Sequence, residues 1–236
     1  MKSDISIIIC AYNEESNIKN AVRSVTHAVY NLVNNYEIII VDDGSTDKTG
    51  KIADSLASKN SKIKVIHHKH NMGLGHSFRD GIAQASMSYL GGFPGDNDMS
   101  WISLRNLISE MGKADIVISY MVNPQSRSLL RRLISRLYVI SINFLFGLKL
   151  RYYNGYFVAK LENLKDTILR SDRFTLFTEI IVKLIKSGYT YKEIPFKHTG
   201  RTHGKSKAIS ISSIITTCSS ISMLFYDVYL NPKRKT

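Results

Sequence analysis

The sequence predicts an α/β fold, built on a mostly parallel β-sheet with helices on both faces. Apolar runs of strand length alternate with amphipathic helical segments through the first hundred residues. Loops rich in Asp, Asn and Gly follow the expected strands. Because the carboxyl ends of parallel strands meet at one edge of a sheet, we expect these loops to converge where ligands of such folds bind.

Each expected element rests on a local pattern. Apolar, largely β-branched runs predict strands at Ile5–Cys10, Tyr36–Val41, Lys62–His67 and Tyr89–Phe93, the last weakened by its two glycines. Helical periodicity predicts helices at Ser16–Leu32, Thr46–Ser58 and Leu74–Met87. Ser45 is expected to cap the second of these helices.

Composition limits the architecture and the partners. A chain of 236 residues that is 44% hydrophobic can bury one substantial core. We expect a domain over residues 1–200, with one half to residue 100 and a second half after it, and a basic loop and amphipathic helix over 201–236. Two cysteines form neither a disulfide framework nor a zinc site, which favours a reducing compartment. The net charge of +13 indicates a polyanionic partner.

Missing motifs narrow the function classes. The loop after the first strand lacks the glycine fingerprint of dinucleotide enzymes, and no phosphate-binding loop of the nucleoside triphosphatases is present. No nucleic-acid-binding motif accompanies the positive charge. A sugar nucleotidyltransferase would carry a basic glycine-rich loop after the first strand, but this loop is the acidic Asn13-Glu14-Glu15. A nucleotide held partly by carboxylates and a metal remains.

The tripeptide Asp96-Asn97-Asp98 is the most informative local feature. It follows the fourth expected strand, and two carboxylates one residue apart can bind one divalent cation. Such a tripeptide is common in simple turns when it stands alone. Here Asp42-Asp43 crowns another strand, and Tyr12-Asn13-Glu14 and Asn71-Met72-Gly73 follow two more. The agreement of four strand ends favours a site.

These motifs carry a family resemblance. Segments 8–15, 41–47 and 71–75, together with Asp96-Asn97-Asp98, are similar to the family-two inverting glycosyltransferases of the GT-A fold. In the second half, Phe177-Thr178-Glu179, Glu193-Ile194-Pro195-Phe196 and segment 201–207 resemble the dolichyl-phosphate mannose synthases and other polyprenyl-phosphate glycosyltransferases. The resemblance implies an inverting hexosyltransferase with a GT-A sheet.

The resemblance also implies roles for individual residues. Asp96 and Asp98 would bind Mg²⁺ or Mn²⁺ against the donor diphosphate and act in catalysis with Arg201. Asp42 or Asp43 would meet the base or ribose. The remaining nucleotide-sugar contacts implied are Ala11, Tyr12, Asn13, Glu14, Asn71, Gly73 and Asn97. Glu14 can equally cap the first helix, Tyr12 can simply form a wall, and Arg79 either steadies the acidic cluster or is a solvated helix residue.

Departures from the synthase pattern leave the donor sugar and the lipid open. The metal tripeptide continues as Met99-Ser100 rather than with Leu, and Ser119 is followed by Tyr120 rather than Arg. Segment 151–156 replaces the usual Asp-containing loop. The guanosine and uridine donors therefore both remain, as GDP-mannose or a UDP-hexose.

The chemistry of the acceptor favours a lipid phosphate. A hydroxyl acceptor needs a base to remove its proton, whereas a phosphate with a second pKa of about 6 is already anionic near neutral pH. Cations that could position it are Arg127, Arg131, Arg132, Arg201, Lys205 and Lys207. Glu179 is the best spare base candidate, although a structural role is favoured for a helix-face Glu.

Two regions suggest contact with an anionic membrane surface. Arg127, Arg131, Arg132 and Arg136 precede the apolar segment 137–148 at helical spacing. An apolar stripe in segment 211–228, which core packing explains about as well, ends in the basic tail at 233–235. No signal peptide or convincing transmembrane helix is expected. We expect peripheral binding at the cytoplasmic face.

The sequence thus predicts single-displacement transfer of a sugar from a nucleotide donor to a polyprenyl phosphate, with inversion. Transfer to a hydroxyl of a surface glycan or glycolipid is the alternative within the class. A noncatalytic nucleotide- or lipid-binding scaffold is the alternative outside it. The oligomeric state stays open.

Overall fold

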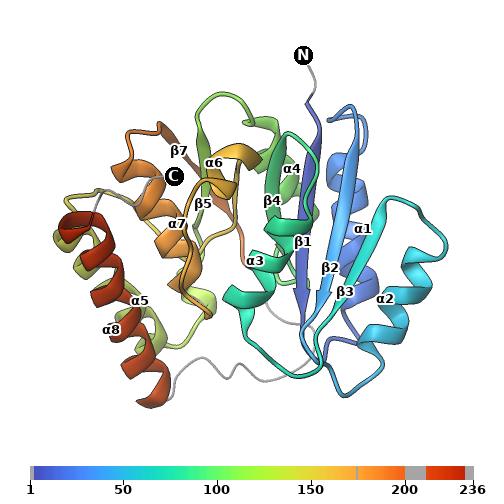
Figure 1. The fold of residues 1–236 in the computed structure, drawn as a ribbon, viewed down its shortest axis with the longest axis horizontal. Coiled ribbons are helices and arrows are strands. Elements are labelled where there is room, and N and C mark those ends of the chain that lie inside the picture. Colours follow the sequence, from blue (N-terminus) through green and yellow to red (C-terminus); the bar gives the residue numbers. More distant parts are fainter. Residues whose placement is uncertain (1–2, 174, 200–210, 232–236) are drawn as a thin grey trace.

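A single seven-stranded sheet organises the chain (Figure 1). The structure is a computed structural model that describes residues 3–173, 175–199 and 211–231. The sheet order is β3-β2-β1-β4-β6-β5-β7. The strands are β1 (Ile5–Ala11), β2 (Tyr36–Asp42), β3 (Ile63–His67), β4 (Tyr89–Pro94), β5 (Ile116–Met121), β6 (Phe157–Lys160) and β7 (Tyr191–Phe196). The expected mostly parallel α/β sheet is confirmed.

The sheet is parallel except at β6, which runs antiparallel to both β4 and β5. At the centre, β1 pairs with β2 from Ile5↔Tyr36 to Ala11↔Asp42, and with β4 up to Cys10↔Pro94. These strands are apolar runs buried on both faces, as parallel strands between helical layers must be. Their carboxyl ends therefore lie level at one edge of the sheet.

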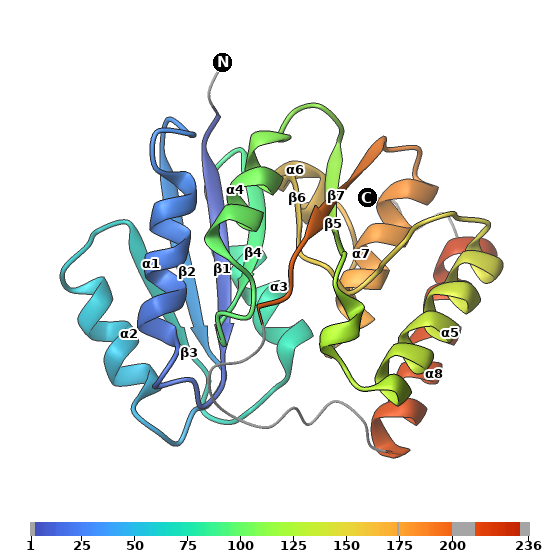
Figure 2. The same cartoon turned by 180° about the vertical axis from the view of Figure 1, so that it is seen from behind.

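Helices cover both faces (Figures 1 and 2). They are α1 (Ile18–Val29), α2 (Thr49–Ala57), α3 (Leu74–Gln84), α4 (Trp101–Ser109), α5 (Leu129–Phe146), α6 (Leu161–Lys165), α7 (Thr175–Lys186) and α8 (Ile211–Phe225). A short 3₁₀ turn, η1 (Pro124–Ser126), precedes α5, and a π-helical turn, η2 (Tyr226–Leu230), follows α8. α1, α2 and α4 lie on one face, and α3, α6 and α7 on the other. Two apolar clusters fill these layers.

The start of α2 corrects one prediction. The helix begins at Thr49, so Ser45 does not cap it. The Ser45 hydroxyl instead accepts the backbone N–H of Asn13, at 3.0 Å. Asp47 takes the local role, because its carboxylate accepts the N–H and hydroxyl of Thr49. A contact between two loops thus outcompetes the local capping pattern. The first and third helices are also shorter than the sequence suggested.

At the β5–β7 end of the molecule, α5 and α8 lie side by side (Figures 1 and 2). The rings of Phe225 and Tyr229 pack beside Phe146, with centroids 6.3 and 6.1 Å away. Over the part of the chain that is described, no helix has both the length and the apolar character needed to cross a bilayer.

Glu179 on α7 is a structural residue of the core. Its side chain is buried, and its carboxylate accepts the backbone N–H groups of Arg170 and Ser171 at 2.9–3.1 Å. Lys183 donates to it at 2.7 Å and also binds Asp227 at 2.8 Å. Glu179 therefore ties the loop before α7 and the turn after α8 to the sheet layer.

We predict that Glu179→Ala lowers the free energy of unfolding by about 3–5 kcal/mol, because it leaves buried N–H donors and a lysine without their acceptor. Urea denaturation of the variant measures this. The matched control is Glu162→Ala, which removes an exposed carboxylate and should cost less than about 1 kcal/mol. Equal effects of the two changes would contradict the structural role.

Candidate active site

The loops after β1 and β2 are hydrogen-bonded to each other. Asn13 has a positive φ of 56°, and its side-chain oxygen accepts the N–H of Thr46 at 2.8 Å. The Thr49 hydroxyl accepts the N–H of Glu14, and the carboxylate of Glu15 accepts the N–H of Lys48. These contacts hold the two predicted nucleotide loops together as one wall of the site.

Glu14 serves the start of α1. Its carbonyl accepts the N–H groups of Asn17 and Ile18, both at 2.9 Å, and its carboxylate accepts the Asn17 side-chain amide at 2.7 Å. The helix N-cap itself is Asn17, which has no side-chain capping hydrogen bond, so Glu14 supports the segment before the helix. Tyr12 beside it is 40% exposed, so its ring remains available to a ligand.

Asp43 fixes the glycine loop. One carboxylate oxygen accepts the Met72 N–H and contacts His68 Nδ1, both at 2.8 Å, and the other accepts the Gly73 N–H at 2.9 Å. Burial of Asp43 opposes ionisation, but these hydrogen bonds outweigh burial and lower the pKa of its carboxyl group. Gly73 has φ 94°, and a Cβ there would lie 2.6 Å from the Asp172 carbonyl oxygen, so only glycine fits.

Asp42 retains more capacity for a ligand. Among the described residues, one Asp42 oxygen accepts the Ser45 N–H at 3.2 Å and the other lies 3.1 Å from His67 Nδ1. A carboxylate offers about four acceptor positions. The acceptor positions of Asp43 are occupied by contacts within the protein. Asp42 is therefore the carboxylate of this pair that has more acceptor positions left for a ligand.

The metal tripeptide forms a tight turn after β4. Asn97 has φ 55°, its N–H binds the Pro94 carbonyl, and its side chain accepts the Ser24 hydroxyl at 2.9 Å. The Asp98 N–H lies 3.3 Å from an Asp96 carboxylate oxygen. The turn is thus held against α1, with both carboxylates on one short segment. The Asn97 side chain supports this turn.

His198 joins the site, which the sequence reasoning did not anticipate. Its Nε2 lies 3.0 Å from the Asp98 carboxylate, and a β-bridge pairs Met99 with His198. Asn123 holds the His198 backbone through two hydrogen bonds of 2.8 and 2.9 Å. A hundred residues separate His198 from Asp98, and no local pattern marks it. Only the sheet topology, which brings the end of β7 beside the β4 turn, reveals it.

The donor set around Asp98 fits a divalent cation. Carboxylate oxygens are ordinary ligands of Mg²⁺ and Mn²⁺. Among the residues that the structure describes, no group of three or more His, Cys, Asp or Glu side chains could hold a metal ion. Mg²⁺ typically takes one or two carboxylates and completes its shell with substrate phosphates and water. Asp96 and Asp98 would supply those carboxylates, with His198 paired to Asp98.

Arg127 is a cation with an unpaired donor. It precedes α5, and its Nη1 lies 3.3 Å from the Tyr152 hydroxyl. Its Nε is buried and has no hydrogen-bond partner among the residues that the structure describes. Arg131 lies one turn further, on α5. The other predicted phosphate cations, Arg201, Lys205 and Lys207, lie outside the described residues.

Arg79 lies away from the acidic strand ends. It donates to the Ser171 carbonyl at 2.6 Å and pairs with Asp172. It neither steadies the acidic cluster nor extends into solvent. It joins α3 to the loop before α7, because Gly75 allows that loop to pass close to the helix.

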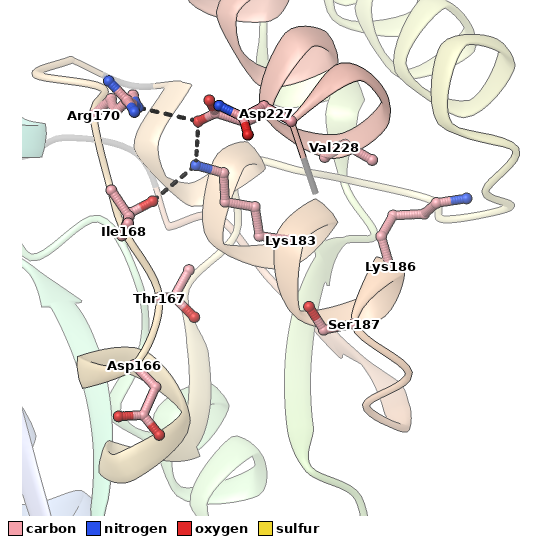
Figure 3. A pocket seen from close by; sticks show the side chains of 10 residues that line it. Asp166, Thr167, Ile168, Arg170, Lys183, Lys186, Ser187, Asp227 and Val228 are labelled. Atoms are coloured by element: carbon pink, nitrogen blue, oxygen red, sulfur yellow. Dashed lines mark hydrogen bonds and ion pairs between the residues drawn. The ribbon is translucent and has the colours of Figure 1, made fainter. Parts of the chain in front are cut away.

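A cavity of about 330 Å³ lies elsewhere, between α7 and the turn after α8 (Figure 3). Three of its charged groups are paired with each other: Asp227 binds Lys183 at 2.8 Å and Arg170 at 3.2 Å. The acidic strand ends do not line it. This cavity is therefore separate from the candidate active site.

Comparison with known proteins places the chain in a family. The model of glycosyl transferase family 2 matches residues 6–168. The chain belongs to this family. The match covers the loops described above, from β1 to the segment after β6, and so confirms the resemblance seen in the motifs.

Two of the relatives of this chain carry names that point to different acceptors. An undecaprenyl-phosphate 4-deoxy-4-formamido-L-arabinose transferase of Pseudomonas fluorescens is 26% identical over 86% of this chain and 59% of its own length. An uncharacterized glycosyltransferase of Haemophilus influenzae is 34% identical over 42% of this chain and 30% of its length. A cholesterol galactosyltransferase of Borreliella burgdorferi is 32% identical over 55% of this chain and 37% of its length. The chain thus spans less than two thirds of these relatives.

A solved structure with the same fold is glucosyl-3-phosphoglycerate synthase of Mycobacterium tuberculosis. Its complex with Mn²⁺, UDP-glucose and phosphoglyceric acid superposes with a TM-score of 0.70 at 16% identity, covering 96% of this chain and 79% of that one. The likeness confirms the expected GT-A fold.

His67 supplies a pH-dependent prediction. Its imidazole contacts Asp42 at 3.1 Å and Asp54 at 2.9 Å. The hydrogen bond with Asp54 is the main reason that the pKa of His67 is raised above 6.5. Burial of the ring lowers this pKa, but the hydrogen bond with Asp42 also raises it. A raised histidine pKa stabilises the fold fully below about pH 6.5. This stabilisation is lost as the pH rises through the folded-state pKa.

We therefore expect His67→Asn to be less stable than wild type at pH 6, with the difference shrinking toward pH 9. Urea denaturation across this range measures it. Subtracting the free energy of unfolding of the variant from that of wild type cancels the contributions of the other titrating groups. A difference that stays constant with pH would show that the His67 charge does not stabilise the fold.

Asp98→Asn tests the metal turn. The substitution keeps the side-chain shape but removes the charge, so we expect an unchanged circular dichroism spectrum and glycosyl transfer lowered by about 100-fold or more at saturating Mn²⁺. Asp166→Asn, a carboxylate lining the separate cavity, is the control and should retain full activity. Undiminished transfer by Asp98→Asn would remove this residue from the site.

Proposed function

We propose that this protein transfers a hexose from a nucleotide-diphosphate sugar to the phosphate of a polyprenyl phosphate, with inversion at the anomeric carbon. The observation that carries the proposal is the buried Nε of the half-buried Arg127, which has no hydrogen-bond partner among the described residues. A buried donor without an acceptor is costly unless a ligand satisfies it. An acceptor phosphate would do so.

The position of Arg127 fits this role. Tyr152, its hydrogen-bond partner, packs near Phe196, two residues before His198. Asn123, four residues before Arg127, holds the His198 backbone. The segment from Asn123 to Arg127 thus both fixes His198 beside Asp98 and carries the candidate phosphate cation. Arg131 and, from the family resemblance, Arg201, Lys205 and Lys207 would complete the phosphate site.

On the donor side, Asp42 would meet the base or ribose, with Ala11, Tyr12, Asn13, Glu14 and Asn71 around it. Asp43 and Gly73 would shape this pocket by holding the glycine loop in place. Asp96 and Asp98 would bind Mg²⁺ or Mn²⁺, which would neutralise charge on the departing nucleoside diphosphate. A UDP-hexose and GDP-mannose both fit this arrangement.

The acceptor phosphate attacks the anomeric carbon from the face opposite the leaving group, forming the new C–O bond as the bond to the diphosphate breaks. A phosphate oxygen needs no base near neutral pH. This agrees with Glu179, the base candidate from the sequence, whose carboxylate is committed to the core. The residues of the site therefore position the acceptor phosphate and neutralise the charge of the leaving diphosphate, and none of them has to remove a proton.

The polyprenyl acceptor also agrees with the relative from Pseudomonas fluorescens, named as an undecaprenyl-phosphate transferase. We further propose peripheral binding to an anionic bilayer at the cytoplasmic face. The net charge of +13 and the arginines at the start of α5 support electrostatic attraction to such a surface.

Transfer to a hydroxyl is the second candidate. The similarity to a cholesterol galactosyltransferase favours it, since a sterol presents a hydroxyl and no phosphate. Asp96 or Asp98 would then have to supply the base in addition to holding the cation. The buried, unpartnered donor of Arg127 would have no phosphate to bind.

Incubation of the purified protein with UDP- and GDP-hexoses, Mn²⁺ and either polyprenyl phosphate or the matching polyprenol separates these candidates. Mass analysis of the lipid should find one added hexose on the phosphate and none on the polyprenol. Glycosylation of the polyprenol or a sterol instead would favour the hydroxyl acceptor. Nucleotide binding without any product would favour a noncatalytic scaffold.

We expect Arg127→Lys and Arg201→Lys each to slow transfer by about tenfold or more while leaving UDP or GDP binding unchanged, because lysine keeps the charge but loses the planar fork that matches a phosphate. Arg23→Lys on the exposed face of α1 is the matched control. Titration calorimetry for the nucleotide and initial rates for transfer give the two readouts. Equal loss of both functions would place these arginines on the donor side instead.

A further inference from the structure

Helix α5 is apolar on two opposite sides, and the described part of the chain covers only one of them. Tyr138, Ile142 and Phe146, spaced by four residues, face the core cluster. On the other side, Leu130, Leu133, Leu137, Ile140 and Phe144 follow one another at intervals of three and four residues, which places them in one line. We call these five residues the α5 stripe.

The α5 stripe is exposed along its whole length. Leu130, Leu133, Leu137 and Ile140 are 55–62% exposed, and Phe144 is 86% exposed. From Leu130 to Phe144 the helix rises by about 21 Å, at about 1.5 Å for each residue step. Single apolar residues on a surface are ordinary, but a continuous line of large ones indicates a surface that is covered in use.

The charges beside the stripe identify the kind of partner. Arg132 and Arg136 lie one turn apart on α5, both exposed, and the helix contains no acidic residue. Two like charges at this spacing repel each other unless an anion lies between them. A second copy of this chain would bring more arginines to the seam and no carboxylate from this helix, so a seam between two copies is disfavoured.

An anionic lipid monolayer satisfies both features. Its acyl region takes the apolar side chains, and its headgroups neutralise the arginines, as for amphipathic helices that lie in the plane of a membrane. We propose that the α5 stripe inserts into an anionic lipid leaflet, so that this protein docks through an internal helix of its catalytic domain. Attraction by charge alone, as invoked above for the basic regions, would not require the stripe.

The exposure and the charges of α5 do not depend on the proposed function. Only the reason for membrane docking, delivery of a lipid-linked phosphate to Arg127, rests on that proposed function. Arg127 lies two residues before α5 and is the candidate phosphate cation. With the α5 stripe in the leaflet, the first turn of the same helix lies at the headgroup level. A lipid-linked phosphate could then reach Arg127 without leaving the membrane.

Vesicle sedimentation tests the proposal directly. Wild-type protein is mixed with vesicles of phosphatidylcholine and phosphatidylglycerol at low salt and at about 1 M salt, where charges are screened beyond about 3 Å. We expect binding at low salt and a remaining bound fraction at high salt. Leu137→Gln should weaken partitioning by about tenfold, which corresponds to about 1.4 kcal/mol, because the polar side chain loses the favourable burial in the acyl region. Leu133→Gln with Phe144→Gln should abolish the salt-resistant fraction.

The controls separate the components. Ile102→Gln on α4 changes a residue with 53% exposure, matching the 55% of Leu137, and should bind as wild type does. Arg132→Gln with Arg136→Gln should weaken binding at low salt but keep the salt-resistant fraction. Vesicle binding unaffected by the stripe substitutions overturns the proposal. So does a dimer, seen by light scattering, that the stripe substitutions convert to a monomer while vesicle binding persists.

The assay contains no sugar donor, so it is independent of the reaction. Stripe-dependent binding without glycosyl transfer would leave the docking surface intact and refute the proposed function. Transfer to a short-chain, water-soluble prenyl phosphate with no stripe-dependent vesicle binding would do the reverse. If both hold, stripe variants should retain transfer to the soluble acceptor and lose it on vesicles.

Discussion

Parallel pairing of β1 with both β2 and β4 is the constraint on which the rest of the structure depends. The register places Ala11 beside Asp42 and Cys10 beside Pro94, so the chain leaves all three strands at the same edge. Every loop that follows must then occupy the same small volume. Acidic groups that are far apart in the sequence become neighbours for this reason, and a cation with a nucleoside diphosphate is the kind of ligand that such a gathering suits.

The converging loops are fixed by hydrogen bonds that span long stretches of chain. Asp43 holds the backbone of the glycine loop, and Asn13 binds the loop after β2. Asn123 fixes His198 beside the turn after β4. A site assembled in this way is arranged before any ligand arrives, which lowers the cost of binding. The two halves of the sheet meet at Asp98 and His198, one from each side of the antiparallel β6.

The sequence was most informative where patterns are local. Continuous apolar runs predicted β1 to β4 to within one residue at nearly every boundary, and the acidic loops behind them predicted the site. Ser45 was misread as a helix cap because its hydroxyl bonds to Asn13, 32 residues away. His198 was missed because its place beside Asp98 depends on the order of strands β4 to β7 and not on any nearby residue. The outer face of α5 showed as an apolar segment, but only the fold reveals which of its two apolar sides is covered.

We propose that the turn after β4, with His198 beside it, holds the cation of a nucleoside diphosphate through Asp96 and Asp98. Crystals grown with UDP or GDP and Mn²⁺ test this site through anomalous diffraction at a wavelength where manganese scatters. We expect one strong peak within coordination distance of the Asp96 and Asp98 carboxylates, with the diphosphate on its other side. Nucleotide bound at the strand ends with no manganese peak beside Asp98, or with the peak at another place, would contradict it.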